Sequence, residues 1–379
     1  MSEVDFKVIT IKEVKTILDG IRFTEFPNKM YKKNPFYVPA LSLDERNVFN
    51  EKKNPVFEYC EAVRYLAYHD GKIVGRIAGI INHKLNDAYK IKTGRFTRLD
   101  MIDDIEVTKA LIDQVTKWAK EKGMNKLIGP IGFTDLDRQG MLVDGFDQLN
   151  MFITIYNHPY YMEHMEKLGF VKDVDWTEKQ IIWPTSIPEK VTRGAEIARK
   201  RYGYELIKCK TKKEVFKYVY EAFDMYNVAF NELYGFFPIT NKVMDYYIKQ
   251  VIQLVQLNYL WFVLDKEKKV VGFTVIMPSL AEANKKANGH LFPFGWWHIL
   301  RGLKKYDVID LYFIAIDPKH QGHGIIAMNW EDGILEGLKH NVRYAETGPE
   351  LELNDAIQNQ WKNFEFIEHK RRRCYTKDI

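Results

Sequence analysis

Three short sequence patterns occur twice in this chain, in the same order and at a nearly constant spacing. The pairs are Thr10–Val14 with Thr211–Val215, Tyr65–Gly75 with Tyr259–Gly272, and Tyr156–Phe170 with Leu353–Phe366. Corresponding residues are separated by between 194 positions (Tyr65 to Tyr259) and 201 positions (Glu13 to Glu214). Self-similarity at a fixed spacing indicates a duplicated structural unit. We therefore expect the 379 residues to fold as two copies of one domain.

Three capping boxes mark expected helix starts. In a capping box, a Ser or Thr hydroxyl and a Glu three residues later satisfy backbone amides that have no partner within the helix. The boxes are Thr10 with Glu13, Ser186 with Glu189, and Thr211 with Glu214. The box at Ser186 also has a proline in the first turn, where the missing N–H costs little. We place the join there and predict domains at residues 1–185 and 186–379.

The remaining elements follow the same order in both halves. Apolar runs on either side of a polar turn predict one hairpin around residues 65–75 and another around 259–272. Asn125–Gly132 and Val342–Gly348 are typical of strands that precede the last helix of each half. Each half therefore consists of helix, hairpin, strand, helix, strand, helix and strand, which indicates a mixed α/β domain.

Each half carries a different insertion of similar length. In the first half it is Gly129–Phe146, where Asp135, Asp137 and Arg138 either bind substrate or form an ordered loop network. In the second half it is Asn288–Tyr306, which is rich in aromatic residues between Phe292 and Trp297. We expect these rings to pack within the insertion, with an acyl channel or a dimer patch as alternatives.

Composition excludes a disordered chain, a collagen-like chain and a small disulfide scaffold. With 46% hydrophobic and 28% charged residues, the chain has the composition of a globular protein. The net charge of +5 is too weak to require nucleic acid, so none is expected as a partner. Lys370–Arg373 is the strongest basic run; we interpret it as a solvated strand end, with a coenzyme phosphate, RNA or an acidic partner as alternatives.

The chain is expected to be cytoplasmic and to have no membrane partner. Residues 1–5 contain acids where a signal peptide would have bases. The most apolar stretches, Val251–Leu264 and Leu291–Leu303, are shorter than the roughly 18–20 apolar residues of a membrane span. Only three cysteines are present, which fits a reducing compartment.

The most informative segment joins a strand to a helix through a glycine-containing turn. Leu311–Ile316 is typical of a buried strand, and apolar residues from Ile326 to Leu338 recur every four positions, as on a buried helix face. Gln321-Gly322-His323-Gly324 therefore lies at a helix N-terminus, where outward-pointing amides bind phosphate or pyrophosphate. His320 and His323 have no third ligand nearby, so no metal site is predicted.

This segment resembles the fingerprint of the GNAT superfamily of acyl-coenzyme A-dependent N-acyltransferases. Ile316-Asp-Pro318 and Gln321-Gly-His-Gly324 match the fingerprint, whereas Ile326 stands where the family has Gly or Ala. A later element of the family resembles Asn354–Phe366, with Trp361 in place of a tyrosine and Glu365 in place of a glycine. Both halves together look like a tandem GNAT protein of a poorly characterised bacterial family. The resemblance implies two domains with mixed, mostly antiparallel sheets flanked by helices.

The resemblance also implies a coenzyme site in the second half. Pantetheine of acetyl-CoA or another acyl-CoA would pair with the backbone of Ile314 and Ile316. The pyrophosphate would bind the turn and first helical residues, and Asn354 belongs to the later element. The predicted coenzyme-binding residues are Ile314, Ile316, Gln321, Gly322, His323, Gly324, Ile325, Ile326 and Asn354.

Catalysis in the family needs a base that removes the amine proton and an acid for the leaving thiolate. Glu346 and Glu352, on or after the next strand, are the base candidates, with Asp310 and Tyr312 as alternatives. The usual acid position corresponds to Trp361, which cannot donate a phenolic proton. Tyr375 or a water could serve instead, or the thiolate could leave unaided.

The two halves are not expected to be equivalent. The corresponding helix start in the first half, Leu99–Glu106, has several carboxylates and no glycine pair. Carboxylates at a helix N-terminus would repel a pyrophosphate. We therefore predict that only the second half binds coenzyme A, and that the first half is a degenerate copy.

The leading hypothesis is an N-acyltransferase, most simply an N-acetyltransferase, that acts on a small-molecule or peptide amine. Two alternatives are an acyl-CoA-binding or scaffolding protein without catalysis, and an aminoacyl or fatty-acyl transferase with the paired fold. The sequence leaves open the acceptor, the acyl chain length and the oligomeric state.

Overall fold

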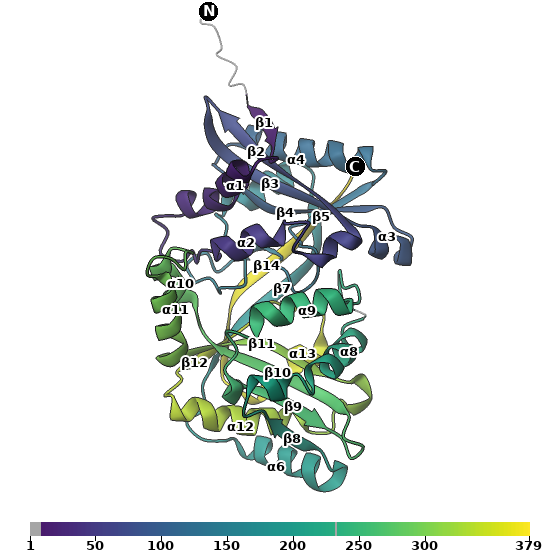
Figure 1. Ribbon diagram of the computed structural model, residues 1–379, viewed down its shortest axis with the longest axis vertical. Coiled ribbons are helices and arrows are strands. Elements are labelled where there is room, and N and C mark those ends of the chain that lie inside the picture. Colours follow the sequence, from purple (N-terminus) through teal and green to yellow (C-terminus); the bar gives the residue numbers. More distant parts are fainter. Residues whose placement is uncertain (1–8, 232) are drawn as a thin grey trace, which may run out of the picture. The chain divides into compact units, whose positions relative to one another are not determined.

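The computed structural model describes residues 9–231 and 233–379 (Figure 1). Residues 1–5, whose sequence argues against a signal peptide, lie outside the described residues. The chain forms two compact units. The first unit holds the described residues up to Trp176, together with Asn284–Trp296 and Lys370–Ile379; the second holds Thr177–Ala283 and Trp297–His369. These units differ from the predicted division at residue 185, because two later segments belong to the first unit.

The first half of the chain builds most of the first unit. Its elements are β1 (Thr10–Glu13), α1 (Ile17–Met30), α2 (Ser42–Val48), β2 (Cys60–His69), β3 (Lys72–Asn82), α3 (His83–Tyr89), β4 (Thr93–Met101), α4 (Ile105–Glu121), β5 (Lys126–Gly129), β6 (Met141–Asp144), α5 (Tyr160–Lys167) and β7 (Val171–Ile182). The strand order in this unit is β1-β2-β3-β4-β5-β14. All neighbours are antiparallel except β4 and β5, which run parallel.

The second half repeats this order with additional helices. Its elements are α6 (Glu189–Ile197), β8 (Glu205–Lys208), α7 (Lys212–Val215), α8 (Val219–Ala229), α9 (Asn241–Val251), β9 (Leu260–Leu264), β10 (Val270–Pro278), α10 (Ala281–Ala287), α11 (Gly295–Lys304), β11 (Val308–Ile316), α12 (Ile325–Lys339), β12 (Tyr344–Thr347), β13 (Glu350–Leu351), α13 (Asp355–Gln360) and β14 (Phe366–Asp378). The strand order is β7-β12-β11-β10-β9-β8, with β11 and β12 parallel.

The predicted hairpins and the duplicated α/β architecture are confirmed. Strands β2 and β3 pair antiparallel, as do β9 and β10. In each half the hairpin is followed by one parallel strand pair, β4 with β5 and β11 with β12, joined by the long helices α4 and α12. Mixed, mostly antiparallel sheets with flanking helices are therefore present in both halves, as expected.

Two of the three capping boxes are wrong. Thr10–Glu13 is strand β1, which pairs with β2, and the first helix begins six residues later behind a capping box of Thr16 and Asp19. At the join, Pro188 is the extended residue before α6, so Ser186 lies too far away to cap it. The Thr211 hydroxyl does cap α7, by accepting a hydrogen bond from the amide of Glu214 at 3.3 Å.

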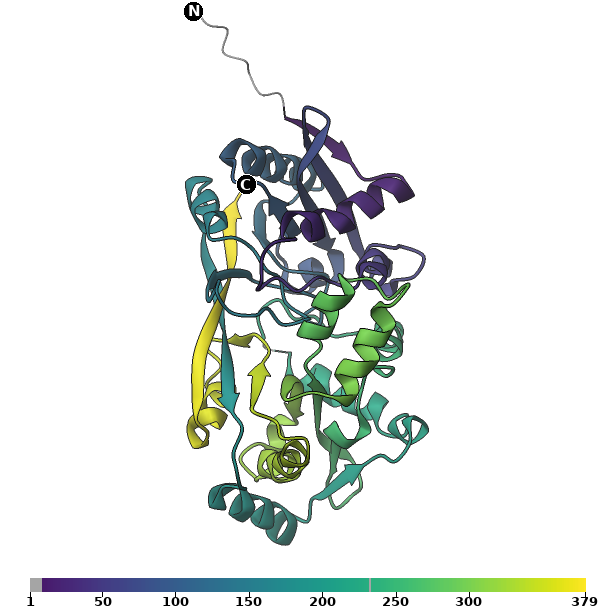
Figure 2. The same ribbon diagram turned by 90° about the vertical axis from the view of Figure 1, so that its left-hand side faces the viewer.

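The last strand of each half continues into the other unit. Residues 177–182 of β7 belong to the second unit, where Gln180 pairs with Glu346 of β12. Residues 370–378 of β14 belong to the first unit, where Tyr375 pairs with Gly129 of β5. Figure 2 shows β14 as one long yellow strand. Each sheet therefore contains a strand from the distant part of the sequence.

This exchange overturns the interpretation of Lys370–Arg373 as a solvated strand end. Arg372 is fully buried and donates to the carbonyl oxygen of Ile155 and to Oδ1 of Asn150. Arg373 binds the buried carboxylate of Asp175 through Nε at 2.8 Å. Arg372 is buried and Arg373 half-buried in the first unit because β14 lies within its sheet, and carboxylate and carbonyl oxygens compensate their charge.

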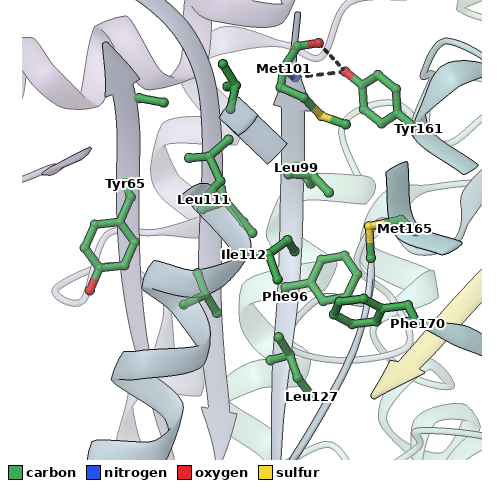
Figure 3. Close-up of a cluster of buried hydrophobic side chains, with 14 of the residues drawn as sticks. Tyr65, Phe96, Leu99, Met101, Leu111, Ile112, Leu127, Tyr161, Met165 and Phe170 are labelled. Carbon is green, nitrogen blue, oxygen red and sulfur yellow. Dashed lines mark hydrogen bonds between the residues drawn. The ribbon is translucent and has the colours of Figure 1, made fainter. Parts of the chain in front are cut away.

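The core of the first unit lies between the sheet and α4 (Figure 3). Phe96 and Leu99 of β4 pack with Leu111 and Ile112 of α4, and the Tyr161 hydroxyl accepts from the amide of Met101 at 3.0 Å. Tyr375, a candidate acid, is 1% exposed and belongs to this core. That position makes it a packing residue of the first unit.

The core of the second unit includes the predicted buried face of α12. Trp330 and Ile334 of this helix pack with Ile309 of β11, Trp261 of β9 and Trp361. None of the helices in the described ranges is long and apolar enough to cross a membrane.

Candidate active site

Strand β11 changes partners along its length. A β-bulge at Tyr312 interrupts its pairing with β10. Val275 of β10 faces Phe313 and the next residue, Ile276, faces Leu311, so the register of this pairing skips Tyr312 between them. On the other side, β12 pairs with β11 only from Val308 to Leu311. Beyond the bulge, residues 313–316 have no partner in β12. This edge of β11, which includes the half-buried Ile314 and Ile316, can accept an extended chain that carries amide groups.

The turn after β11 presents backbone amides at a helix N-terminus. Gly322 and Gly324 have φ angles of +76° and +84°, in the left-handed region that favours glycine. Within residues 233–379, the amides of residues 322–326 find no hydrogen-bond acceptor; the next amide, of Ala327, donates to the carbonyl oxygen of Gly324. Gln321 and Gly322 are exposed. The arrangement suits an anion that bridges several N–H groups.

The two glycines have different roles. A Cβ on Gly322 would meet nothing within 4 Å. A Cβ on Gly324 would collide with the carbonyl oxygen of Gly194 on α6. Gly324 is therefore required for the packing of α12 against α6, whereas Gly322 lies beside open space.

The histidines of the turn are fixed by two tyrosines. The Tyr204 hydroxyl lies 2.7 Å from Nδ1 of His320 and 2.9 Å from Nδ1 of His323. The Tyr202 ring stacks on His323 with 4.1 Å between centroids. No group of residues that could hold a metal ion is found in the part of the chain that the structure describes.

Helix α12 begins with two isoleucines whose side chains face the core. Ile325 is 1% exposed and packs with Val271 and Met328. Ile326 packs partly against the core around Trp330. Their side chains thus serve packing, and only their amides face the predicted pyrophosphate position.

Glu346 lies at the start of the open edge. It stands on β12 directly opposite Asp310 of β11, and both side chains are buried. Nε2 of His369 lies 2.8 Å from Oε2 of Glu346. A carboxylate held by an imidazole can pass a proton to a second group. The sequence had not indicated His369.

The other candidates are less enclosed. Tyr312 is half-buried at the bulge, and Glu352 is half-buried after β13. Oδ1 of Asn354 accepts from the amide of Ile357 at 3.3 Å and so caps α13. The structure brings Glu346 and Asp310 together and leaves Glu352 on a separate loop.

Glu350 is a further, largely buried carboxylate of the second unit, and the sequence did not indicate it. Burial raises its pKa to about 7, although Lys179 and Trp361 favour its charged form. Nε1 of Trp361 donates to both carboxylate oxygens at 2.9 Å, and Nζ of Lys179 lies 3.3 Å away. Nζ of Lys179 also donates to Oε1 of Gln358 at 2.6 Å. Trp361, which replaces the expected tyrosine, therefore orients a buried carboxylate.

The corresponding positions of the first half are filled by its own chain. The amide of Ile131, just after β5, donates to the carbonyl oxygen of Phe96 on β4 at 3.0 Å. At the start of α4, Oδ1 of Asp104 accepts from the amide of Glu106 at 3.0 Å. A carboxylate thus occupies the place where an anionic ligand would bind. The degenerate first half stays a prediction.

A buried charge network surrounds Arg98 of β4. Arg98, with φ of +51°, binds Oε1 of Glu45 at 2.6 Å and Oδ1 of Asp137 at 2.8 Å. Nη2 of Arg138 donates to the carbonyl oxygen of Phe152 at 2.9 Å. For Asp137 and Arg138, the ordered loop network is the interpretation that these contacts favour.

Comparisons with known proteins agree with this architecture. The chain is 26% identical over 367 residues to Protein YghO of Escherichia coli K12, covering 94% of this chain and 92% of that protein. It is 25% identical over 389 residues to a bacterial ceramide synthase of Caulobacter vibrioides, covering 98% of each. No protein-family model matches the chain.

Solved structures show the same fold. A tandem GNAT protein from the clavulanic acid biosynthesis pathway superposes with a TM-score of 0.57 at 12% identity, over 98% of both chains. The GCN5-related glucosamine N-acetyltransferase region of a fungal multi-domain enzyme gives a TM-score of 0.58 at 13% identity, over 99% of this chain and 38% of that one. Together with the duplicated sheets, these likenesses identify the chain as a protein of the tandem GNAT fold.

Proposed function

We propose that this chain is an acyl-CoA-dependent N-acyltransferase whose coenzyme site lies in its second half. The single observation that carries the proposal is the continuity of two binding features. The open edge of β11 at residues 313–316 leads directly into the amide-lined turn at residues 321–326. Pantetheine has amides that pair with a strand edge, and the pyrophosphate attached to it is the anion that such a turn binds.

The proposed reaction is a direct transfer to an amine. The amine nitrogen attacks the thioester carbonyl carbon, a C–N bond forms, the C–S bond breaks, and coenzyme A leaves as the thiol. Glu346, hydrogen-bonded to His369, takes the proton that the amine loses. Tyr312, at the bulge beside the open edge, is the proposed donor to the sulfur. Glu352 remains the second base candidate.

A long-chain amino alcohol is the acceptor that we propose among small-molecule and peptide amines. The support is the name of one relative, a bacterial ceramide synthase, whose likeness extends over 98% of both chains. A ceramide is the N-acyl derivative of such an amino alcohol. A peptide amine is the alternative outcome of the assay described below.

The binding step is tested by calorimetry with acetyl-CoA and with a long-chain acyl-CoA. Gly322→Glu places a carboxylate beside the turn without a steric clash and should abolish binding. Gly123→Glu is the matched control, because Gly123 also has a positive φ of +80° and open space around it. If neither acyl-CoA binds the wild type, or if Gly322→Glu binds as well as the wild type, the proposal is refuted.

The chemical step is tested by mass spectrometry of products from a long-chain amino alcohol and from a peptide amine. We expect an amide product that requires acyl-CoA. Glu346→Gln should lower turnover by about 10²–10⁴-fold while acyl-CoA binding is retained, as for loss of a general base. Full activity of Glu346→Gln would assign the base to another residue, and Glu352→Gln would then be the variant to measure.

A further inference from the structure

The insertion of the second half carries large apolar side chains on its outside. They lie on the turn before α11 and on one face of that helix, and their exposed fractions range from 45% to 80%. These residues are Phe292, Phe294, Trp296, Trp297 and Leu300, which we call the aromatic surface. The expectation that these rings pack within the insertion is therefore wrong.

The aromatic surface is held outward by the opposite face of α11. Ile299 and Leu303 are 5% and 8% exposed and anchor the helix. Gly302 lets α11 approach α10 closely, because a Cβ there would lie 2.9 Å from Cβ of Ala283. Nε1 of Trp296 donates to the carbonyl oxygen of Pro293 at 3.0 Å, which fixes that ring. The rings cannot turn inward without unpacking the helix.

The charged side chains of residues 283–306, which carry the aromatic surface, are all basic, and Glu25 of α1 lies 3.3 Å from His290 of this segment. Residues 283–306 contain no Asp or Glu, and the five basic residues among them are Lys285, Lys286, Arg301, Lys304 and Lys305. The guanidinium of Arg301 lies over the Trp297 ring at 5.4 Å. Arg301 and Lys304 are exposed on the same helix as the tryptophans. Two such surfaces on two copies of this chain would repel each other, which argues against a dimer interface.

We propose that the aromatic surface binds an anionic lipid bilayer, with α11 lying in the interface. Tryptophan and phenylalanine side chains are favoured at the boundary between headgroups and acyl chains. Basic residues beside them gain from the negative surface potential of anionic lipids. A helix with one apolar face flanked by basic residues binds by both contributions together. The sequence argument against a membrane partner considered only a spanning segment, which this mode does not need.

This inference rests on the surface alone and does not require the proposed acyltransferase activity. The two are related in one respect, because a lipid amine acceptor would reside in a bilayer. The test below measures membrane binding without substrate or acyl-CoA, so its outcome and that of the calorimetry are independent.

The experiment is flotation of the full chain with vesicles of phosphatidylcholine alone and of phosphatidylcholine with phosphatidylglycerol. We expect the wild type to float with the anionic vesicles and to be released as salt is raised. The double variant Trp296→Ala/Trp297→Ala should bind at least about tenfold more weakly, because both tryptophan rings of the aromatic surface are lost. The control Phe216→Ala/Tyr220→Ala removes two rings that are each 44% exposed elsewhere and should bind as the wild type does.

Two further variants separate the contribution of the basic residues to membrane binding from that of the aromatic rings. Arg301→Glu/Lys304→Glu should abolish the preference for anionic vesicles and the salt dependence. Phe292→Ser/Phe294→Ser changes only the turn before α11 and provides a second test if the tryptophan variant does not fold. Wild-type binding by both ring variants would overturn the inference. So would failure of the wild type to float, including a result in which it instead forms dimers that the tryptophan variant does not form.

Discussion

Glu350 provides the sharpest test of the electrostatics of the second unit. Its side chain is 11% exposed, and burial raises its pKa from 4.5 to about 7 despite the nearby Lys179 and the Trp361 indole. In the unfolded chain this carboxyl ionises near its ordinary pKa. Between pH 4.5 and 7, the folded protein therefore retains a proton that the unfolded chain releases, and stability falls as pH rises through this window.

The size of the effect follows from the two pKa values. A rise from 4.5 to about 7 corresponds to about 3 kcal/mol of unfolding free energy that is present at low pH and absent above pH 7. Glu350→Gln keeps an oxygen that can accept from the indole of Trp361 and cannot ionise. The difference in stability between the variant and the wild type should therefore shift in favour of the variant by about 3 kcal/mol from pH 4.5 to pH 8.

The assay is urea unfolding of both proteins at half-unit steps between pH 4.5 and 8. Trp361→Phe is the companion variant, because it removes the indole donor that favours the ionised carboxylate. Because the pKa of Glu350 should be higher without this donor, the pH-dependent loss of stability of Trp361→Phe should extend to higher pH than that of the wild type. A constant difference between Glu350→Gln and the wild type across this range would refute the reasoning.

Other predictions concern both halves. Gly324→Ala should lower the unfolding free energy by about 3 kcal/mol and Gly322→Ala by about 1 kcal/mol in urea titrations, because only Gly324 faces a backbone oxygen. Arg98→Met should cost about 3–5 kcal/mol by the same measurement, since it leaves two buried carboxylates without their cation. Burial opposes ionisation of Glu45, but Arg98 together with Arg138 and Arg76 outweighs it, and the pKa falls to about 2. The stability that Glu45 contributes should therefore be present above pH 4.5 and be lost as the pH falls toward 2, seen in thermal melts. Asp104→Ala should cost about 1 kcal/mol in the same melts and leave acyl-CoA binding unchanged.

Local patterns predicted much of the fold. The hairpins β2–β3 and β9–β10, the strand β11 and the helix α12 follow from apolar periodicity, which depends on neighbours in the sequence. Thr10–Glu13 shows where this fails. Its side chains suit a capping box, yet pairing with β2 satisfies the backbone in another way. The prediction that Arg372 is solvated failed for the same reason, because its partners Asn150 and Ile155 are more than 200 residues away in the sequence.

The candidate site was predictable where a motif is continuous in sequence. The turn from Gln321 to Gly324 is such a motif, since its conformation is set by two glycines and the helix that follows. The sequence did not indicate Glu350 or His369, because their contacts in the site are made with residues that are not their neighbours in the sequence. Lys179, which contacts Glu350, lies in the last strand of the first half, and nothing in its own sequence neighbourhood signals that contact.

The exchange of β7 and β14 has a consequence for biosynthesis. Residues 370–379 complete the sheet of the first unit, where Tyr375 enters the core beside Phe96 and Phe170. A nascent chain that has emerged only to residue 185 therefore lacks a strand of that sheet, and β5 presents an unpaired edge throughout the synthesis of the second half. The sheet of the first unit therefore stays incomplete until residues 370–379 have left the ribosome. Chaperone demand should accordingly be high while residues 186–370 are translated.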